Sequence, residues 1–206
     1  MTAHGHDVDR FNRWAAGYDQ HWMQRKIFDP VQRTLLQLAA EQVARPGAIL
    51  DVGCGTGKLL GLARGRFPDA RLVGVDAAIE MVKQARASHP TGGIEFQQAM
   101  AEELPFADAS FDLAFSTMTF HHWQDQNKGV AEIARVLTPG GRWLLAEFVA
   151  TGWVNQVRKL LRLNRFPERA GLQAVLATAG LKSVAEEAVP GLRGQVTVFA
   201  IATTRA

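Results

Sequence analysis

A glycine-rich loop between a short apolar strand and a helix is the feature that most constrains how this chain can fold. The predicted strand is Ala48–Val52, and the loop reads Asp51-Val-Gly-Cys-Gly-Thr-Gly57. Glycine has no Cβ, so this backbone can turn with positive φ and come within contact distance of a ligand. The helix that follows presents free N–H groups to the loop, which favours a negatively charged ligand group. Its apolar positions have near-helical spacing and are Leu59, Leu62, Ala63 and Phe67.

The spacing of the glycines distinguishes between two classes of nucleotide-binding protein. In the dinucleotide fingerprint G-x-G-x-x-G, the last glycine comes one residue later than it does here. A G-x-G-x-G loop with an Asp two positions ahead of it resembles motif I of the class I S-adenosylmethionine-dependent methyltransferases. The alternative at this point is a loop that uses glycine only for packing. The resemblance implies that S-adenosylmethionine contacts Asp51, Gly53, Cys54, Gly55 and Gly57.

A second predicted strand, Arg71–Asp76, ends in a carboxylate 19 residues beyond Gly57. An acidic residue at this place can accept hydrogen bonds from both ribose hydroxyls of a nucleoside. The alternative role of Asp76 is to cap the helix that starts near Ala78. The resemblance also places Ala77 and Met81 in the cofactor site, with Met81 against the adenine, although a methionine at helical spacing belongs to the core by default.

The third motif is the segment 94–106, Ile-Glu-Phe-Gln-Gln-Ala-Met-Ala-Glu-Glu-Leu-Pro-Phe. It resembles the family segment that runs from the third strand into a loop reading G-D-A-E-x-L-P-F. Ala99 and Met100 stand where the family usually has Gly and Asp, and that Asp commonly accepts a hydrogen bond from the adenine amino group. The Met100 thioether is too weak an acceptor to replace it. We therefore expect apolar contact between the adenine and Met100, and polar contact with backbone groups around Ala101 and Glu102.

The fourth motif, Ser110–Trp123, begins as a strand and ends in a loop with paired histidines. It resembles the F-D-x-V-x-S-x-x-x-x-H-H stretch of the methyltransferases of ubiquinone and menaquinone biosynthesis. The resemblance places Thr117 in the cofactor site. His121 and His122 are candidates for a general base, because imidazole titrates near neutral pH. The alternative for this pair is a structural or cofactor-side role.

The segment 136–147 then matches the family's turn into its fifth strand, and Pro139–Gly141 is a turn signal in its own right. A predicted helix precedes it, with apolar positions Val130, Ile133, Ala134 and Leu137. Near the end of the chain we predict a helix over 168–180 and strands over 181–189 and 195–202. Together the motifs imply an α/β, Rossmann-like fold: a seven-stranded, mostly parallel sheet with helices on both faces and a C-terminal antiparallel hairpin.

The N-terminal segment 1–44 is predicted to form a helical cap on a cofactor-binding domain at 45–206, the whole being one compact domain. A second helix is expected after Pro30, with Val31, Leu35 and Leu38 facing inward. The segment 11–19 resembles a family segment F-D-x-x-A-x-x-Y-D whose Tyr lies over the methionine part of the cofactor, which implies this role for Tyr18. One apolar helix face is predicted ahead of Pro30, made of Phe11, Trp14, Ala15, Tyr18 and Trp22.

The segment 153–165 is predicted to form a basic amphipathic helix, with Arg158, Arg162 and Arg165 on one side. Such a helix usually covers the core with its charges in solvent. The other interpretation is peripheral contact with an anionic lipid surface or with an acidic substrate.

Composition excludes several other classes of protein. With 206 residues and 47% hydrophobic content, the chain can bury a full core, and no apolar run approaches a membrane span. The N-terminus lacks a signal-peptide h-region, so we expect a cytoplasmic protein. A net charge of +3 is too mild to indicate nucleic acid binding, and no zinc-ligand spacing indicates a metal. Cys54, the only cysteine, is expected to be a packing residue rather than a nucleophile.

The predicted function is in-line transfer of a methyl group from S-adenosylmethionine to a small, partly hydrophobic acceptor. One alternative is a non-catalytic protein that binds S-adenosylmethionine as a regulatory or interaction module, which Met100 favours modestly. The other is a nicotinamide (NAD)-dependent oxidoreductase, which would share only the first two motifs. The sequence does not distinguish an O-, N- or C-acceptor and does not indicate an oligomeric state.

Overall fold

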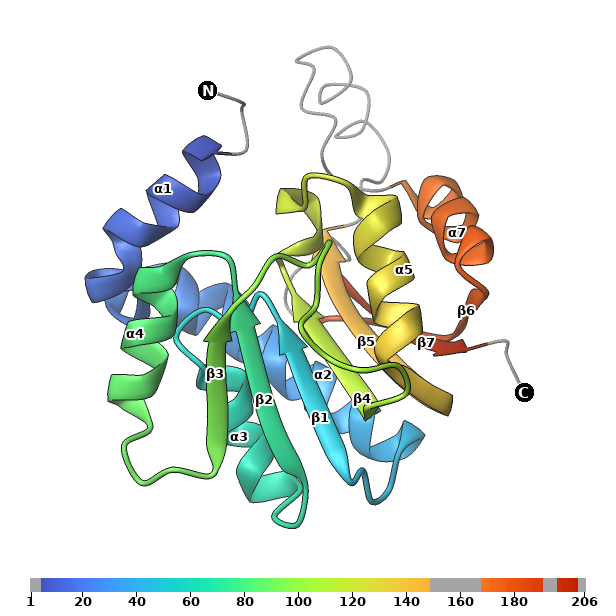
Figure 1. Cartoon of the computed structure of the whole chain (residues 1–206), viewed down its shortest axis with the longest axis horizontal. Helices are drawn as coiled ribbons and strands as arrows, with labels where there is room; N and C mark the ends of the chain where they lie inside the picture. Colours follow the sequence, from blue (N-terminus) through green and yellow to red (C-terminus); the bar gives the residue numbers. More distant parts are fainter. Residues whose placement is uncertain (1–4, 149–167, 191–195, 204–206) are drawn as a thin grey trace.

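A seven-stranded sheet organises the computed structural model, which describes residues 5–148, 168–190 and 196–203 (Figure 1). The strands are β1 (Ala48–Val52), β2 (Arg71–Asp76), β3 (Ile94–Gln98), β4 (Phe111–Thr117), β5 (Leu137–Phe148), β6 (Leu181–Ala188) and β7 (Val196–Thr203). The α-helices are α1 (Gly5–Trp14), α2 (Asp29–Gln42), α3 (Lys58–Arg66), α4 (Ile79–Ser88), α5 (Gln126–Val136) and α7 (Arg169–Thr178). Shorter turns of helix are η1 (Ala15–Gln20), η2 (Gln24–Phe28) and η3 (Phe120–His122).

The strand order is β3-β2-β1-β4-β5-β7-β6. Strands β1 to β5 are parallel, whereas β7 runs antiparallel to both β5 and β6. The predicted Rossmann-like sheet and its C-terminal hairpin are therefore confirmed. The chain reverses its direction of winding between β1 and β4, and in α/β sheets this switch point is where ligands bind.

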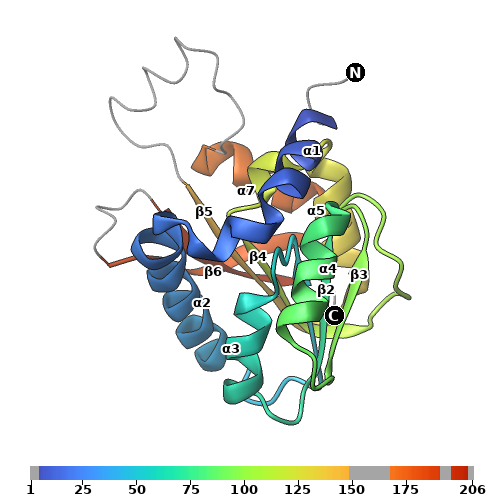
Figure 2. The ribbon, with the colours of Figure 1, turned by 90° about the vertical axis from the view of Figure 1, so that its left-hand side faces the viewer.

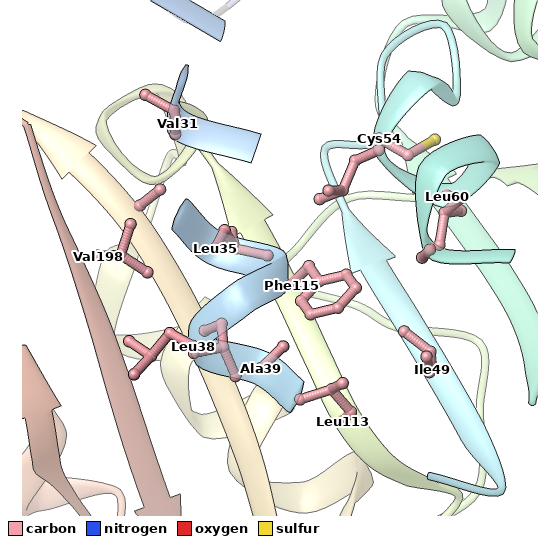
Figure 3. Close-up of a cluster of buried hydrophobic side chains, with 14 of the residues drawn as sticks. Val31, Leu35, Leu38, Ala39, Ile49, Cys54, Leu60, Leu113, Phe115 and Val198 are labelled. Carbon is pink, nitrogen blue, oxygen red and sulfur yellow. The ribbon is translucent and has the colours of Figure 1, made fainter. Parts of the chain in front are cut away.

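Two apolar layers cover the two faces of the sheet. Helices α2, α3 and α4 bury their apolar sides on one face, and α5 and α7 bury theirs on the other. Successive β1 residues alternate between the layers: Ile49 belongs to the first and Leu50 to the second. In Figure 3, Leu35 and Ala39 of α2 lie over Phe115 of β4. Helix α2, which falls within the predicted cap, thus shares the core of the sheet.

The segment ahead of α2 differs from its prediction as one continuous amphipathic helix. Helix α1 ends at Trp14, and the chain continues as the 3₁₀ turn η1, which contains Gly17. Because a 3₁₀ turn rotates more per residue than an α-helix, the predicted apolar face is not maintained. Trp14 and Trp22 are 49% and 61% exposed, so their predicted inward placement was wrong. Ala15 is buried as predicted.

Three further predictions concern Leu62, the turn at Pro139–Gly141 and the segment 153–165. Leu62, predicted to face the core from α3, is 46% exposed. The predicted turn at Pro139–Gly141 lies inside β5 as an irregularity, because Leu137 pairs with Phe111 while Arg142 already pairs with Leu113. The predicted basic helix over 153–165 lies outside the described residues. No helix in the described ranges has the length and apolarity that a membrane crossing requires.

Candidate active site

A cleft lies where β1, β2 and β4 end, at the switch point of the sheet. Its empty volume is about 800 Å³, part of which is open to solvent. Helix α1 and η1 form its outer wall, and Figure 2 shows α1 lying next to α4 beyond the strand ends. The lining residues are Asp7, Val8, Phe11, Tyr18, Val52, Gly53, Gly55, Asp76, Ala77, Ala78, Met81, Ala99, Met100, Ala101, Glu102, Thr117, Met118, Thr119, His122, Trp123 and Gln124.

The three glycines of the loop all have positive φ, but they serve different purposes. A Cβ at Gly53 would overlap the side chain of Thr119, which packs onto the loop from the end of β4. A Cβ at Gly55 would meet only the Tyr18 ring, at 3.9 Å, so this backbone is open toward the cleft. A Cβ at Gly57 would lie 2.6 Å from the Phe96 ring, and Gly57 lies outside the cleft. Packing against Phe96 therefore requires a glycine at position 57.

Asp76 holds the backbone at Ala78, directly ahead of helix α4, and also holds the glycine loop. Its Oδ2 accepts a hydrogen bond from the Gly55 N–H at 2.8 Å, and its Oδ1 accepts one from the Ala78 N–H at 2.8 Å. Burial raises the pKa of Asp76, and these two N–H donors oppose the rise. Each carboxylate oxygen can accept a further hydrogen bond, so the side chain retains capacity for two ribose hydroxyls.

Asp51 and Thr117 leave buried polar atoms without partners among the described residues. Asp51 is 1% exposed, and neither its Oδ1 nor the Thr117 Oγ1 has a hydrogen-bond partner there. Both residues line a smaller cavity of about 380 Å³ behind the loop. Burial, with Asp76 nearby, raises the pKa of Asp51 to about 8. A buried carboxyl and hydroxyl without partners fit a ligand that brings hydrogen-bond donors or positive charge.

Cys54 lines the same smaller cavity and is buried. Burial, followed by the charges of Asp76 and Asp51, raises the pKa of its thiol well above the ordinary value. The thiolate is the nucleophilic form of cysteine, so the environment of Cys54 opposes reactivity. The interpretation of Cys54 as a packing residue fits these surroundings.

The opposite wall of the cleft is made by the loop after β3 and by α4. Met81 is buried in a small cluster with Ala15 and Ala78, and it also lines the cleft. Glu102 directs its carboxylate away from a ligand, because Oε1 accepts the N–H groups of Gln124 and Asp125 at 2.6 and 3.0 Å. Glu102 thus offers a ligand its backbone rather than its charge.

The outer wall is aromatic and is linked to the glycine loop by a hydrogen bond. The Phe11 ring meets the Tyr18 ring edge-on, with centroids 6.4 Å apart. Burial and the charges of Asp76 and Asp19 raise the pKa of Tyr18 to about 12, so its hydroxyl stays neutral. The Thr56 hydroxyl donates to Asp19 Oδ1 at 2.8 Å, which ties η1 to the glycine loop.

The paired histidines have separate environments. His121 Nδ1 lies 2.9 Å from both carboxylate oxygens of the fully buried Glu147, and His121 does not line the cleft. His122 lines the cleft, and its Nδ1 lies 3.2 Å from Asp7 Oδ2 of α1. Burial and the neighbouring His121 lower the pKa of His122 to about 4. A neutral imidazole at the cleft can accept a proton.

Comparison with known proteins identifies the family of this chain. A model described as "Methyltransferase domain" matches residues 50–145. A malonyl-[acyl-carrier protein] O-methyltransferase of Methylococcus capsulatus is 30% identical over 200 residues, which cover 93% of this chain and 71% of that protein. The chain belongs to the methyltransferase family. This family assignment favours the methyltransferase prediction over the oxidoreductase alternative.

This chain spans a smaller part of two other relatives. The O-methyltransferase cnsE of Penicillium expansum is 42% identical over 106 residues, 50% of this chain and 38% of that protein. A demethylmenaquinone methyltransferase of Thermus thermophilus is 36% identical over 143 residues, 68% of this chain and 60% of that protein. The chain therefore spans less than two thirds of either relative.

A solved structure shares the fold of the methyltransferase over its whole length. It is the 1,6-didemethyltoxoflavin-N1-methyltransferase of Burkholderia thailandensis, with bound 1,6-didemethyltoxoflavin and S-adenosylhomocysteine. The TM-score is 0.71 at 18% identity, covering 100% of this chain and 92% of that chain. At this identity the likeness shows a shared fold, and the structure of that neighbour contains S-adenosylhomocysteine.

The structure brings most of the predicted site residues of the methyltransferase into one cleft. Those that line it are Tyr18, Gly53, Gly55, Asp76, Ala77, Met81, Met100, Ala101, Glu102, Thr117 and His122. Asp51 and Cys54 lie behind the loop, and Gly57 and His121 lie outside the cleft. Within the described ranges, no group of three or more His, Cys, Asp or Glu side chains could hold a metal ion.

Several lining residues of the methyltransferase were not predicted. Asp7 and Val8 join the cleft from α1, and Thr119, Trp123 and Gln124 join it from the loop after β4. Asp7, Val8 and Phe11 lie at helical spacing on α1, a signal that the sequence carries. Met118 adopts φ +56°, which turns the chain sharply after β4, and no residue type in that stretch indicates the turn.

Proposed function

We propose that this methyltransferase transfers a methyl group from S-adenosylmethionine to a small, partly hydrophobic acceptor bound in the cleft. The observation that carries the proposal is the position of His122, a neutral proton acceptor, in the same cleft as Gly55 and Asp76. The glycine loop and Asp76 suit the nucleoside part of the cofactor. The histidine suits an acceptor that loses a proton when it is methylated.

Each part of the cofactor has a matching group in the chain. Asp76 would accept the ribose hydroxyls, while Met81, Met100 and the backbone at 101–102 would enclose the adenine. Asp51 and Thr117, whose buried atoms lack partners among the described residues, would meet the charged methionine end beneath the Tyr18 ring. When bound, S-adenosylmethionine supplies a methyl group on a positively charged sulfur, already activated for displacement.

The chain itself would contribute orientation and the exclusion of water. Val8, Phe11, Met118 and Trp123 give the cleft an apolar lining next to the polar floor. An acceptor with an apolar body would fill this part of the cleft and bring its reactive atom to the cofactor. The relative that is named for demethylmenaquinone suggests an acceptor of this partly apolar kind.

We also propose a cytoplasmic location and no nucleic acid partner, since the net charge of +3 is low. Peripheral contact with an anionic membrane surface through 153–165 belongs to the same proposal, because its three arginines would lie on one side of a helix. Binding to vesicles with and without anionic lipid measures this contact. Equal binding to both would contradict it.

Calorimetric titration with S-adenosylmethionine and with NAD tests the cofactor, and a methyl-transfer assay over an acceptor panel tests the reaction. We expect S-adenosylmethionine alone to bind, and Asp76→Ala to weaken it strongly. NAD binding would overturn the proposal. Cofactor binding without transfer to any small molecule, protein or RNA would support the non-catalytic alternative, and labelling of a protein or RNA would overturn the small acceptor.

A further inference from the structure

Two adjacent histidines at the end of β4 are each paired with a carboxylate from a different part of the chain. His121 pairs with Glu147 of β5, so both members of that pair belong to the sheet layer. His122 pairs with Asp7 of α1, 115 residues earlier in the chain. The two imidazole rings lie 4.0 Å apart between centroids. The pair at the cleft therefore depends on the N-terminal helix, whereas the other does not.

We propose that Asp7 is a positioning residue, which orients His122 as the proton acceptor of methyl transfer when α1 lies over the cleft. This inference rests on the proposed function, because it assigns the proton-accepting step of that reaction. Asp7 contacts the histidine, and its role is exerted through the imidazole.

The hydrogen bond to Asp7 determines which nitrogen of His122 is available. A carboxylate accepts only, so Nδ1 of a neutral His122 carries the proton and donates it to Asp7 Oδ2. Nε2 is then the acceptor nitrogen. In the reaction, the acceptor's X–H proton moves to Nε2, and the X–H electron pair forms the bond to the methyl carbon. The electron pair of the broken methyl–sulfur bond stays on sulfur, which becomes a neutral thioether.

The charged groups around His122 act on its pKa in opposite directions, and Asp7 is the one that favours proton uptake. Arg10 and Asp7 face it from α1, His121 adjoins it, and Glu147 lies behind His121. Burial and the charges of His121 and Arg10 lower the pKa of His122, while the hydrogen bond and charge of Asp7 raise it. Asp7 is thus the group that stabilises the imidazolium formed by proton uptake. Arg10 holds the other oxygen of Asp7, at 3.1 Å from Oδ1, and leaves Oδ2 for the histidine.

Helix α1 is placed over the cleft by contacts on both sides of this pair. The Phe11 ring meets the His122 ring edge-on, with centroids 5.1 Å apart. The Asn12 side chain accepts the Glu80 N–H at 3.0 Å, which anchors α1 to the start of α4. The geometry of the Asp7–His122 pair is therefore linked to the seating of α1.

The test compares Asp7→Asn with Asp9→Asn, which removes the same charge from an exposed position of the same helix. We expect Asp7→Asn to lower kcat by about 10- to 100-fold while the KM for S-adenosylmethionine changes less than about 2-fold. We expect ¹⁵N imidazole spectra at neutral pH to show the Nδ1–H tautomer of His122 in the wild type, and loss of that preference in Asp7→Asn. Asp9→Asn should match the wild type in both measurements.

The readouts separate failure of this inference from failure of the proposed function. An unchanged kcat in Asp7→Asn, in an enzyme that transfers methyl groups, overturns the inference and leaves the function intact. An Nε2–H tautomer in the wild type overturns it whether or not an acceptor is known. Measurements of melting temperature and cofactor affinity would establish whether the Asp7→Asn variant is folded. His122→Ala should lower kcat at least as far, and adding Asp7→Asn to it should have no further effect, since both act in one unit.

Discussion

The floor and the cover of the cleft face the same ligand space but are stabilised differently. The floor is the glycine loop 53–57 with Asp76, and the cover is α1 with η1. Backbone hydrogen bonds to β2 hold the floor, where the N–H groups of Gly53 and Cys54 both donate to Val75 O. The cover is held by side-chain hydrogen bonds and a small apolar cluster around Ala15 and Met81.

Because of this difference, we expect the floor and the cover to determine different properties of the protein. The floor continues the buried parallel sheet, so opening it requires disruption of the core. Opening the cover would break a few polar contacts and the small apolar cluster, and the cover carries Asp7 and Tyr18. We infer that floor substitutions act mainly on cofactor binding and stability, whereas cover substitutions act mainly on turnover. The following changes are ordered from the largest expected effect to the smallest.

Gly53→Ala should affect the floor most. The new Cβ would overlap Thr119, and φ of +80° is unfavourable for alanine. We expect about 3 kcal/mol less unfolding free energy and at least about 100-fold weaker S-adenosylmethionine binding. Denaturant unfolding and calorimetry measure these. Gly65→Ala in α3 is the control, because no heavy atom lies within 4 Å of its Cβ and a helical alanine is favourable by about 1 kcal/mol.

Asp51→Asn should change how stability depends on pH. The pKa of Asp51 is about 8 in the folded protein and 3.8 ordinarily, so the folded state holds a proton that the unfolded chain releases. The free energy of unfolding therefore falls as the pH rises between these values. The variant should lack this slope, melt above the wild type near pH 8, and bind S-adenosylmethionine at least about 10-fold more weakly. Parallel melting profiles across this pH range would contradict the assignment.

Thr56→Val should loosen the link between floor and cover. It removes the 2.8 Å hydrogen bond to Asp19, so we expect about 1 kcal/mol less stability and about a 3-fold higher KM for the cofactor. The control is Thr178→Val in α7, whose hydroxyl donates to Val175 O away from the cleft. If the control raises KM equally, the Asp19 link has no particular effect on the site.

Met100→Asp should have the smallest effect. An Asp at this position would replace the apolar contact of Met100 with an acceptor for the adenine amino group. We expect the cofactor dissociation constant to fall by about 3-fold, equivalent to about 0.7 kcal/mol. Calorimetric titration measures this. A large loss of binding would show that the site depends on the thioether.

The floor was predictable because its signals are local. The glycine spacing and the carboxylate of Asp76 follow their own strands directly, and β1 and β2 have the predicted bounds. The sequence could not show that Gly57 serves packing against Phe96, because this contact joins separate elements. It left both roles of Asp76 open, and on the helix side the carboxylate accepts one backbone hydrogen bond, from the Ala78 N–H.

The cover was harder to predict because its contacts span the chain. His121 and His122 are identical in type and adjacent, and only Glu147 and Asp7, far away in sequence, distinguish them. Helical periodicity placed Trp14 and Trp22 inside, but both are exposed, and the change to a 3₁₀ turn at Ala15 separates Trp22 from the face that α1 presents. Periodicity assumes one helix type throughout, and that assumption failed in this segment.

The position of β7 in the sheet has a consequence for synthesis on the ribosome. It lies between β5 and β6, yet it follows both in chain order. Until residue 203 has emerged, β5 presents an unpaired edge and β6 has no neighbour in the sheet. An open strand edge can pair with another chain, so unfinished chains would be prone to associate. A chaperone that shields this edge would protect the methyltransferase until β7 has emerged.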